Sequence, residues 1–236
     1  MITIKHIRTI FAMTSIFESG AIGNYSAVGI LPDDAGISYG RHQATDRSNS
    51  LDEIIWKYID LKGTHAFSLK PFLKHLKDDE SAINPDAPWV KQLMDLLKDA
   101  ASDPLMQKAQ DEVFSDKYWT PAYDLGEHLG LIYPLSYAIL YDISIQSGIG
   151  RIAKLRSTFE ESPPLKGGDE QEWSFALSEA RYDWLRNYAS SDPKKQRIVR
   201  STADRAFVYM GLCTGNQWNL PLPMEIKKVI ITESTV

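Results

Sequence analysis

Apolar residues recur at helical spacing along most of this chain of 236 residues. Near the N-terminus, the spacing of Ile7, Ile10, Phe11 and Phe17 predicts a helix over residues 4–17. The same spacing predicts a second helix that begins near residues 48–50. It predicts further helices over residues 69–76, 89–101, 104–117, 172–189 and 198–211. The pattern is therefore typical of a mainly helical protein.

Two segments depart from this spacing. Residues 24–40 mix apolar positions with glycines and a proline, which predicts a short strand region with a turn at Pro32-Asp33-Asp34. Residues 131–149 are apolar on nearly all sides around one acid, Asp142, which predicts a central buried helix. The predicted fold class is mainly α (α+β), with a small β element near residues 24–40.

The connections carry their own signals. Asp103 before Pro104 fits a helix cap followed by proline at the first helical position. Residues 161–170 contain Pro-Pro and Gly-Gly pairs and are predicted to form a loop. The tail from Asn216 is predicted to be extended until about Val229.

Composition excludes several classes of protein. The formal charge of −5 argues against a nucleic-acid binder and is compatible with a cationic partner. One cysteine, Cys213, allows neither an intrachain disulfide nor a cysteine zinc cluster, and its apolar surroundings favour a buried, inert thiol. The five histidines lack metal-ligand spacing, and no phosphate-binding glycine loop occurs. We therefore expect no metal, no cofactor, no nucleic-acid partner and no membrane span, and we find no signal-peptide pattern.

Two groups of acidic residues suggest chemistry. Glu18 ends the first predicted helix, and Asp33-Asp34 follows about 15 residues later in a turn-rich segment. A carboxyl at a helix end and another on a nearby turn is the layout of a two-carboxylate glycosidase. The plainer alternatives are a solvated helix-end charge at Glu18 and turn-forming aspartates after Pro32.

Several blocks of sequence together resemble one known family. They are 17–20 with 33–40 (Phe-Glu-Ser-Gly, then Asp-Asp-Ala-Gly-Ile-Ser-Tyr-Gly), 106–111 with 118–122, 135–142, and 202–205 with 215–216. In order and spacing they resemble glycoside hydrolase family 46, the chitosanases. The resemblance implies a lysozyme-like two-lobed fold, with residues 1–236 as a single catalytic domain whose lobes flank a cleft. It also implies endo-acting, inverting cleavage of β-1,4-linked amino sugars.

The resemblance also implies catalytic roles. Glu18 corresponds to the acid, and neighbouring apolar groups that desolvate it would favour its protonated form. The family's base lies five residues before the hydroxyl residue that holds the attacking water, so Ser38 implies Asp33 as the base, with Asp34 as the alternative. This chain lacks the arginine that well-known members carry after the second acid, which puts the substrate in question.

Further residues are expected at the substrate. Asp34 and the polar segment after Ser38 are interpreted as the wall of the cleft, with substrate contacts from Tyr39, Arg41, His42 and Asp46; the plainer reading is a solvated loop. Asp142, in an apolar helix, must either pair with an arginine or face the cleft. Arg205 is the leading partner and a second substrate contact, and Arg181 and Arg200 are rivals for the pairing.

These observations leave three hypotheses for the function of this protein. The first is a chitosan-cleaving glycosidase. The second is a peptidoglycan-cleaving lysin on the same fold, from a phage or a toxin apparatus. The third is a saccharide-binding module without catalysis. In each case we expect a monomer whose partner is a polysaccharide, acting outside the cell or on a cell wall.

Overall fold

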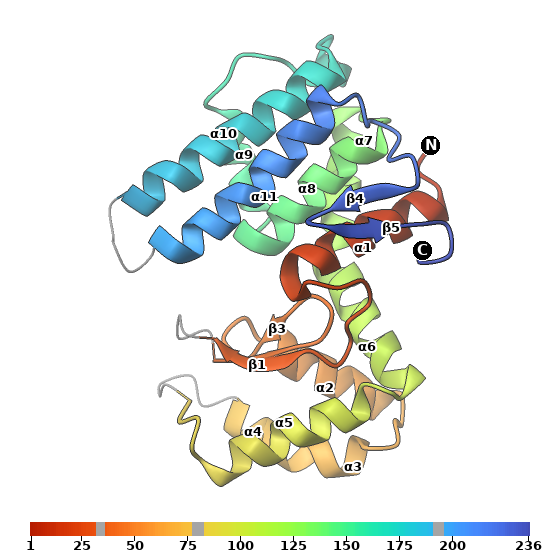
Figure 1. The fold of residues 1–236 in the computed structure, drawn as a ribbon, viewed down its shortest axis with the longest axis vertical. Coiled ribbons are helices and arrows are strands. Elements are labelled where there is room, and N and C mark those ends of the chain that lie inside the picture. Colours follow the sequence, from red (N-terminus) through yellow and green to blue (C-terminus); the bar gives the residue numbers. More distant parts are fainter. Residues whose placement is uncertain (32–35, 77–82, 191–195) are drawn as a thin grey trace. The chain divides into compact units, whose positions relative to one another are not determined.

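A computed structural model of the chain describes residues 1–31, 36–76, 83–190 and 196–236 (Figure 1). The chain forms two compact units: a small unit of residues 14–116, and a large unit of residues 1–13 with 117–236. The chain passes from one unit to the other within α1 (Ile4–Ser19) and within the π-helical η2 (Ser115–Trp119). The expected arrangement of two lobes flanking a cleft concerns how these units are placed and stays a prediction.

The small unit combines one sheet with short helices. Its antiparallel sheet has the order β1-β2-β3, with Gly29 opposite Ser38 and Ser38 opposite Thr45. Its elements are β1 (Val28–Leu31), β2 (Gly36–Tyr39), β3 (Ala44–Thr45), α2 (Ser50–Asp60), α3 (Ala66–Leu69), η1 (Lys70–Phe72), α4 (Leu73–Leu76), α5 (Pro88–Ala100) and α6 (Pro104–Phe114). The sheet confirms the strand region predicted near residues 24–40.

Asp103 caps α6 as the sequence predicts. Its Oδ1 accepts from the Leu105 N–H at 2.9 Å, and its Oδ2 accepts from the Tyr58 hydroxyl at 2.7 Å and the Thr64 N–H at 2.9 Å. The hydrogen bond from Tyr58, followed by those from Thr64 and Leu105, lowers the pKa of Asp103 to about 2. One carboxylate thereby ties α2, the turn after it and the start of α6 together.

The large unit is helical around α8. Eleven of the residues of α8 are buried, from Pro134 to Ser144, which confirms the predicted central helix. The elements are α7 (Thr120–Leu129), α8 (Pro134–Ser147), α9 (Gly150–Arg156), η3 (Pro164–Lys166), α10 (Glu170–Ser190), α11 (Gln196–Thr214), β4 (Met224–Ile226) and β5 (Val229–Ile231). Figure 1 shows α10 and α11 running side by side next to α8. Cys213 is buried, and burial raises its pKa to about 12, as expected of an inert thiol.

Some elements differ from the prediction. The helix expected over 69–76 is three short helical pieces, because Pro71 in the middle piece has no N–H to donate. The apolar spacing of the sequence does not predict α7 or α9. The hairpin β4–β5 is not predicted either, because its turn residues Lys227 and Lys228, which have φ of 48° and 69°, lack the Asn-Gly pattern of such turns.

Within the described ranges, no helix combines the length and the apolar character that crossing a membrane requires.

Candidate active site

Glu18 lies in the last turn of α1 and is half-buried. The helix ends at Ser19, and the next residue, Gly20, has φ +76° and donates its N–H to the Ile16 carbonyl at 3.1 Å. The buried Ser15 hydroxyl donates to the Ala21 carbonyl at 2.7 Å and accepts from the Gly23 N–H at 3.2 Å. The backbone on both sides of Glu18 is thus held by hydrogen bonds, which fixes the point from which its carboxyl projects.

Asp33 and Asp34 lie outside the described residues. The structure describes the strand ends on either side of them, where Leu31 of β1 pairs with Gly36 of β2. Which of the two aspartates acts as the base therefore stays a prediction.

Ser38 sits in the middle of β2 and is 1% exposed. Its hydroxyl donates a long hydrogen bond, 3.4 Å, to the carbonyl oxygen of Gly29 on β1. A serine hydroxyl that donates one hydrogen bond keeps lone pairs that can accept another. Its role in holding a water stays a prediction.

Arg41 forms a network that joins the segment after β2 to α6. Its Nη1 donates to the Tyr25 hydroxyl at 2.9 Å and to Asp111 Oδ1 at 3.0 Å, and the Tyr25 hydroxyl donates to Asp111 Oδ2 at 2.9 Å. The guanidinium carbon lies 5.2 Å from the centre of the Tyr25 ring. Burial is the main reason that the pKa of Tyr25 rises to about 12. Arg41 therefore has a structural partner, and substrate contact by it stays a prediction.

Gln110 lies in the family-like block 106–111 but is not among the expected site residues. It is 1% exposed, its Oε1 accepts from the Arg41 N–H at 3.2 Å, and its Nε2 donates to the Tyr25 carbonyl at 3.1 Å. Gly40 makes this approach possible, because a Cβ there would lie 2.1 Å from Oε1. Gly40 also has φ +79°, a conformation that favours glycine. Gln110 thus holds the backbone before β1, at Tyr25, and the backbone after β2, at Arg41.

Tyr39 lies in the core of the small unit. Its side chain is 0% exposed and its hydroxyl donates to the Leu97 carbonyl at 2.8 Å. Burial raises its pKa above the ordinary value. The Tyr39 hydroxyl therefore has a structural partner in the core of the small unit, and substrate contact by Tyr39 stays a prediction.

His42 and Asp46 are also packed within the small unit. The His42 ring lies 4.7 Å from that of Phe114, and the carboxylate of Asp46 covers Gly36, where a Cβ would come within 2.0 Å of Oδ1. Burial raises the pKa of Asp46 above its ordinary range. The expected open wall is thus largely buried here, because these side chains pack on α6 and β2. Substrate binding by either residue stays a prediction.

Asp142 of the large unit is fully buried between two arginines. Its Oδ2 lies 2.6 Å from Nη1 of Arg181, and its Oδ1 accepts a hydrogen bond from Arg205. Burial alone would raise the pKa of Asp142, but the charges and hydrogen bonds of Arg205 and Arg181 outweigh it and lower the pKa. The expected arginine pairing is confirmed for Arg205 and also for its rival Arg181, while the side chain of Arg200 lies outside the described residues. Substrate contact by Asp142 and Arg205 stays a prediction.

No group of three or more histidine, cysteine, aspartate or glutamate side chains suited to a metal ion occurs in the part of the chain that the structure describes.

Comparison with known proteins gives consistent matches. Residues 12–224 match the model of glycosyl hydrolase family 46. A chitosanase from Bacillus subtilis (strain 168) is 29% identical over 223 residues, which are 91% of this chain and 79% of the relative. The structure of a chitosanase mutant from Bacillus subtilis MY002, complexed with 6 GlcN, has a TM-score of 0.80 at 26% identity, covering 96% of both chains. A family 46 chitosanase from Gynuella sunshinyii, in complex with chitotetraose, shares the fold with a TM-score of 0.83 at 24% identity, covering 98% of both.

Proposed function

The chain belongs to glycosyl hydrolase family 46 and is a glycosidase, and from this premise we propose that it cleaves chitosan within the polymer. The observation that carries the proposal is the match over residues 12–224 together with the chitosanase relatives, one of which was solved with 6 GlcN. Chitosan is a polycation of β-1,4-linked glucosamine, which suits a protein with a formal charge of −5. A polymer substrate of this kind implies action outside the cell.

In the proposed mechanism Glu18 protonates the leaving glycosidic oxygen. Asp33, with Asp34 as the alternative, removes a proton from a water that Ser38 holds on the other face of the sugar. A separation of about 6.5–9.5 Å between acid and base leaves space for that water and gives inversion of configuration. The hydrogen-bonded end of α1, capped by Gly20, supports the assignment of Glu18, because a general acid must reach the leaving oxygen repeatedly in one geometry.

One hydrogen-bond network supports the position of Ser38. Arg41, Tyr25 and Asp111, together with Gln110, hold the segment after β2 against α6 and so steady the strand that carries Ser38. When chitosan binds, carboxylates of the site would accept hydrogen bonds from the ammonium groups of the substrate. Such charge-assisted hydrogen bonds are stronger than those between neutral groups.

Glu18→Gln tests the proposal. We expect the rate of reducing-end release from chitosan to fall by about 10²–10⁴-fold, because the amide has no proton to give to the leaving oxygen. The matched control is Glu172→Gln, an exposed glutamate of α10, which should keep the parent rate and the same melting temperature. Retained activity in Glu18→Gln would remove the assignment.

The substrate is tested with chitosan and purified peptidoglycan side by side. Release of reducing ends from chitosan alone supports the proposal, release from peptidoglycan alone supports the lysin, and binding without cleavage of either supports the non-catalytic module. Proton NMR of the first product from a chitosan oligosaccharide reports the anomer, and retention of configuration would contradict the inverting mechanism.

A further inference from the structure

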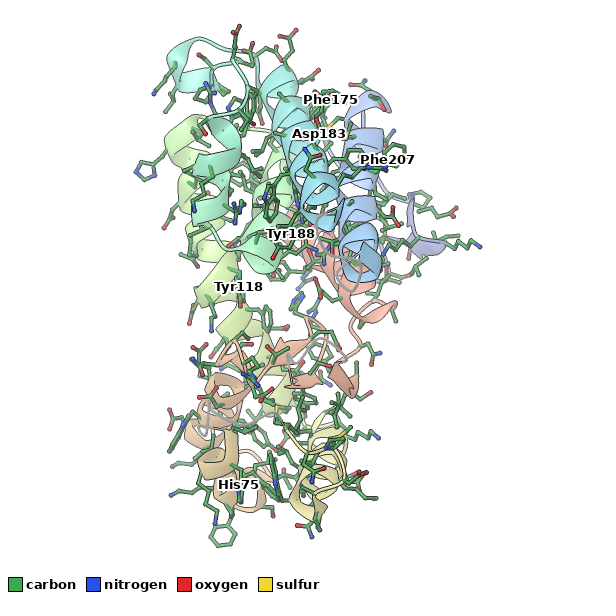
Figure 2. The ribbon with its side chains drawn as sticks, turned by 90° about the vertical axis from the view of Figure 1, so that its left-hand side faces the viewer. His75, Tyr118, Phe175, Asp183, Tyr188 and Phe207 are labelled. Carbon is green, nitrogen blue, oxygen red and sulfur yellow. The ribbon has the colours of Figure 1, made fainter. Side chains whose placement is uncertain are left out.

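Asp46 carries a buried carboxylate that the proposed mechanism does not use. It is 6% exposed, in contrast to His75 of the same unit, whose side chain is exposed (Figure 2). Asp46 directly follows β3, and its backbone N–H donates to the Ile37 carbonyl of β2 at 3.3 Å. Its own carbonyl accepts from the Asn49 N–H at 2.9 Å. The backbone of Asp46 is thus fixed against the sheet of the small unit.

The carboxylate of Asp46 lies against the first residue of β2, Gly36. This glycine has φ +77°, and a Cβ on it would lie 2.6 Å from Asp46 Oδ2 and closer still to Oδ1. Glycine is therefore required here both for its backbone conformation and for the space that the carboxylate occupies. Hydrogen bonding by the backbone N–H groups of Asp46, Ile37 and Arg47 favours the ionised carboxylate. One side chain thereby holds the first peptide of β2, between Gly36 and Ile37.

The ionised form of this carboxylate is held at a cost in stability. Burial raises the pKa of Asp46 and outweighs the backbone hydrogen bonds and the charge of Arg47, which act in the opposite direction. Within the described ranges, Asp46 makes no ion pair, and its Oδ1 is buried without a hydrogen-bond partner. An asparagine would keep one acceptor oxygen without burying a charge. A charge that destabilises the folded state is typical of a position that serves function.

We propose that Asp46 is a positioning residue for the hydrolysis, and that its carboxylate fixes the start of β2 for Ser38. The inference rests on the proposed function, in which Ser38 holds the attacking water. Gly36 stands two positions before Ser38 and two positions after Asp34 in the sequence. A misplacement of about 1 Å can lower turnover by about 10²-fold, so a firm hold on this peptide supports catalysis. Asp46 acts in this way without touching the substrate.

Asp46→Asn tests the proposal, because it removes the charge and keeps the shape of the side chain. We expect kcat on chitosan to fall on the order of tenfold at neutral pH, since charge-assisted hydrogen bonds are about twice as strong as neutral ones. KM should stay at the parent value, and the melting temperature should equal or exceed that of the parent. Asp46→Ser, which also lacks the charge, should lose at least as much kcat. The matched control is Asp86→Asn, an exposed aspartate of the small unit, which should keep all three parent values.

The pH dependence separates positioning by the charge from a structural role. Acid protonates Asp46 in the parent, while Arg47 stays charged, so the parent should then behave like Asp46→Asn. The ratio of parent to variant kcat should therefore be largest at neutral pH and approach one in acid. Because the folded pKa of Asp46 is raised, the stability that it contributes is full below the ordinary 3.8 and is lost as the pH rises through the folded pKa. The melting temperature of the variant should accordingly exceed that of the parent more at neutral pH than in acid.

Three results would overturn the inference. The first is parent kcat in Asp46→Asn. The second is a raised KM with unchanged kcat, which would make Asp46 a substrate contact. The third is a kcat ratio that stays constant with pH while the melting temperature falls, which would make its role purely structural.

Failure of this inference is separable from failure of the proposed function. If parent and Asp46→Asn cleave chitosan at the same kcat, the positioning role is refuted and the proposed function stands. If the parent cleaves peptidoglycan instead of chitosan, the proposed function fails. The same comparison of kcat, made on peptidoglycan, then tests Asp46.

Discussion

Replacing Asp142 by asparagine tests how the large unit is stabilised. Asp142 is 0% exposed, and the two arginines that share its carboxylate, Arg181 and Arg205, have side chains that are 1% and 6% exposed. Removing one member of a buried ion pair costs about 3–5 kcal/mol, because the remaining charge stays desolvated. We expect Asp142→Asn to lower the free energy of unfolding by that amount, a large share of the roughly 5–15 kcal/mol typical of a folded domain.

The pH dependence gives the same prediction a second readout. The pKa of Asp142 in the folded protein lies below the ordinary 3.8, so the stabilisation it contributes is complete above 3.8 and is lost as the pH falls through the folded pKa. The asparagine variant lacks this titration. The difference in stability between parent and variant should therefore be largest near neutral pH and shrink in acid.

Urea denaturation followed by tryptophan fluorescence measures both effects. Four tryptophans belong to the large unit, at positions 119, 173, 184 and 218. The control is Asp204→Asn, an exposed aspartate next to Arg205, which should change stability by no more than about 0.5 kcal/mol. If Asp142→Asn lies within about 1 kcal/mol of the parent, or if the difference grows in acid, the reasoning about the buried carboxylate is refuted.

Two further predictions concern the small unit, and a glycine of the large unit is the comparison for the first. Gly40→Ala should lower the free energy of unfolding by at least about 2 kcal/mol, because of the positive φ and the clash with Gln110. Gly211→Ala, in open space on α11, should raise it by about 0.5–1 kcal/mol. Urea denaturation measures both, and losses of equal size would contradict the role of the close contact at Gly40. Asp103→Ala should lower stability by about 1–2 kcal/mol through loss of the α6 cap. Because folding lowers the pKa of Asp103 from 3.8 to about 2, the stability difference between parent and variant should be full above pH 3.8 and shrink toward pH 2 in thermal melts. A stability difference that does not change with pH would contradict this role of the Asp103 carboxylate.

The sequence by itself determined the local parts of this protein. Apolar periodicity predicted the buried helix α8 and most of α2, α5, α6, α10 and α11, because a helix shows its buried stripe in its own residues. Asp103 followed by Pro104 predicted the start of α6 for the same reason, since a cap acts on its own first turn. The ordered blocks around Glu18 and Asp142 were sufficient to indicate the family, which the match over residues 12–224 bears out.

Only the tertiary structure decided which polar side chains are buried and what they contact. Tyr39 is the last residue of the fully buried strand β2, and the sequence does not say that its hydroxyl donates to the Leu97 carbonyl, 58 positions further along the chain. Likewise, the need of Asp142 for a cation was predictable, but its sharing between Arg181 and Arg205 depends on how α10 and α11 pack beside α8. Periodicity reports that a residue is buried within its own element, whereas the partner it meets is set by contacts between elements distant in sequence, and these form only when the chain folds.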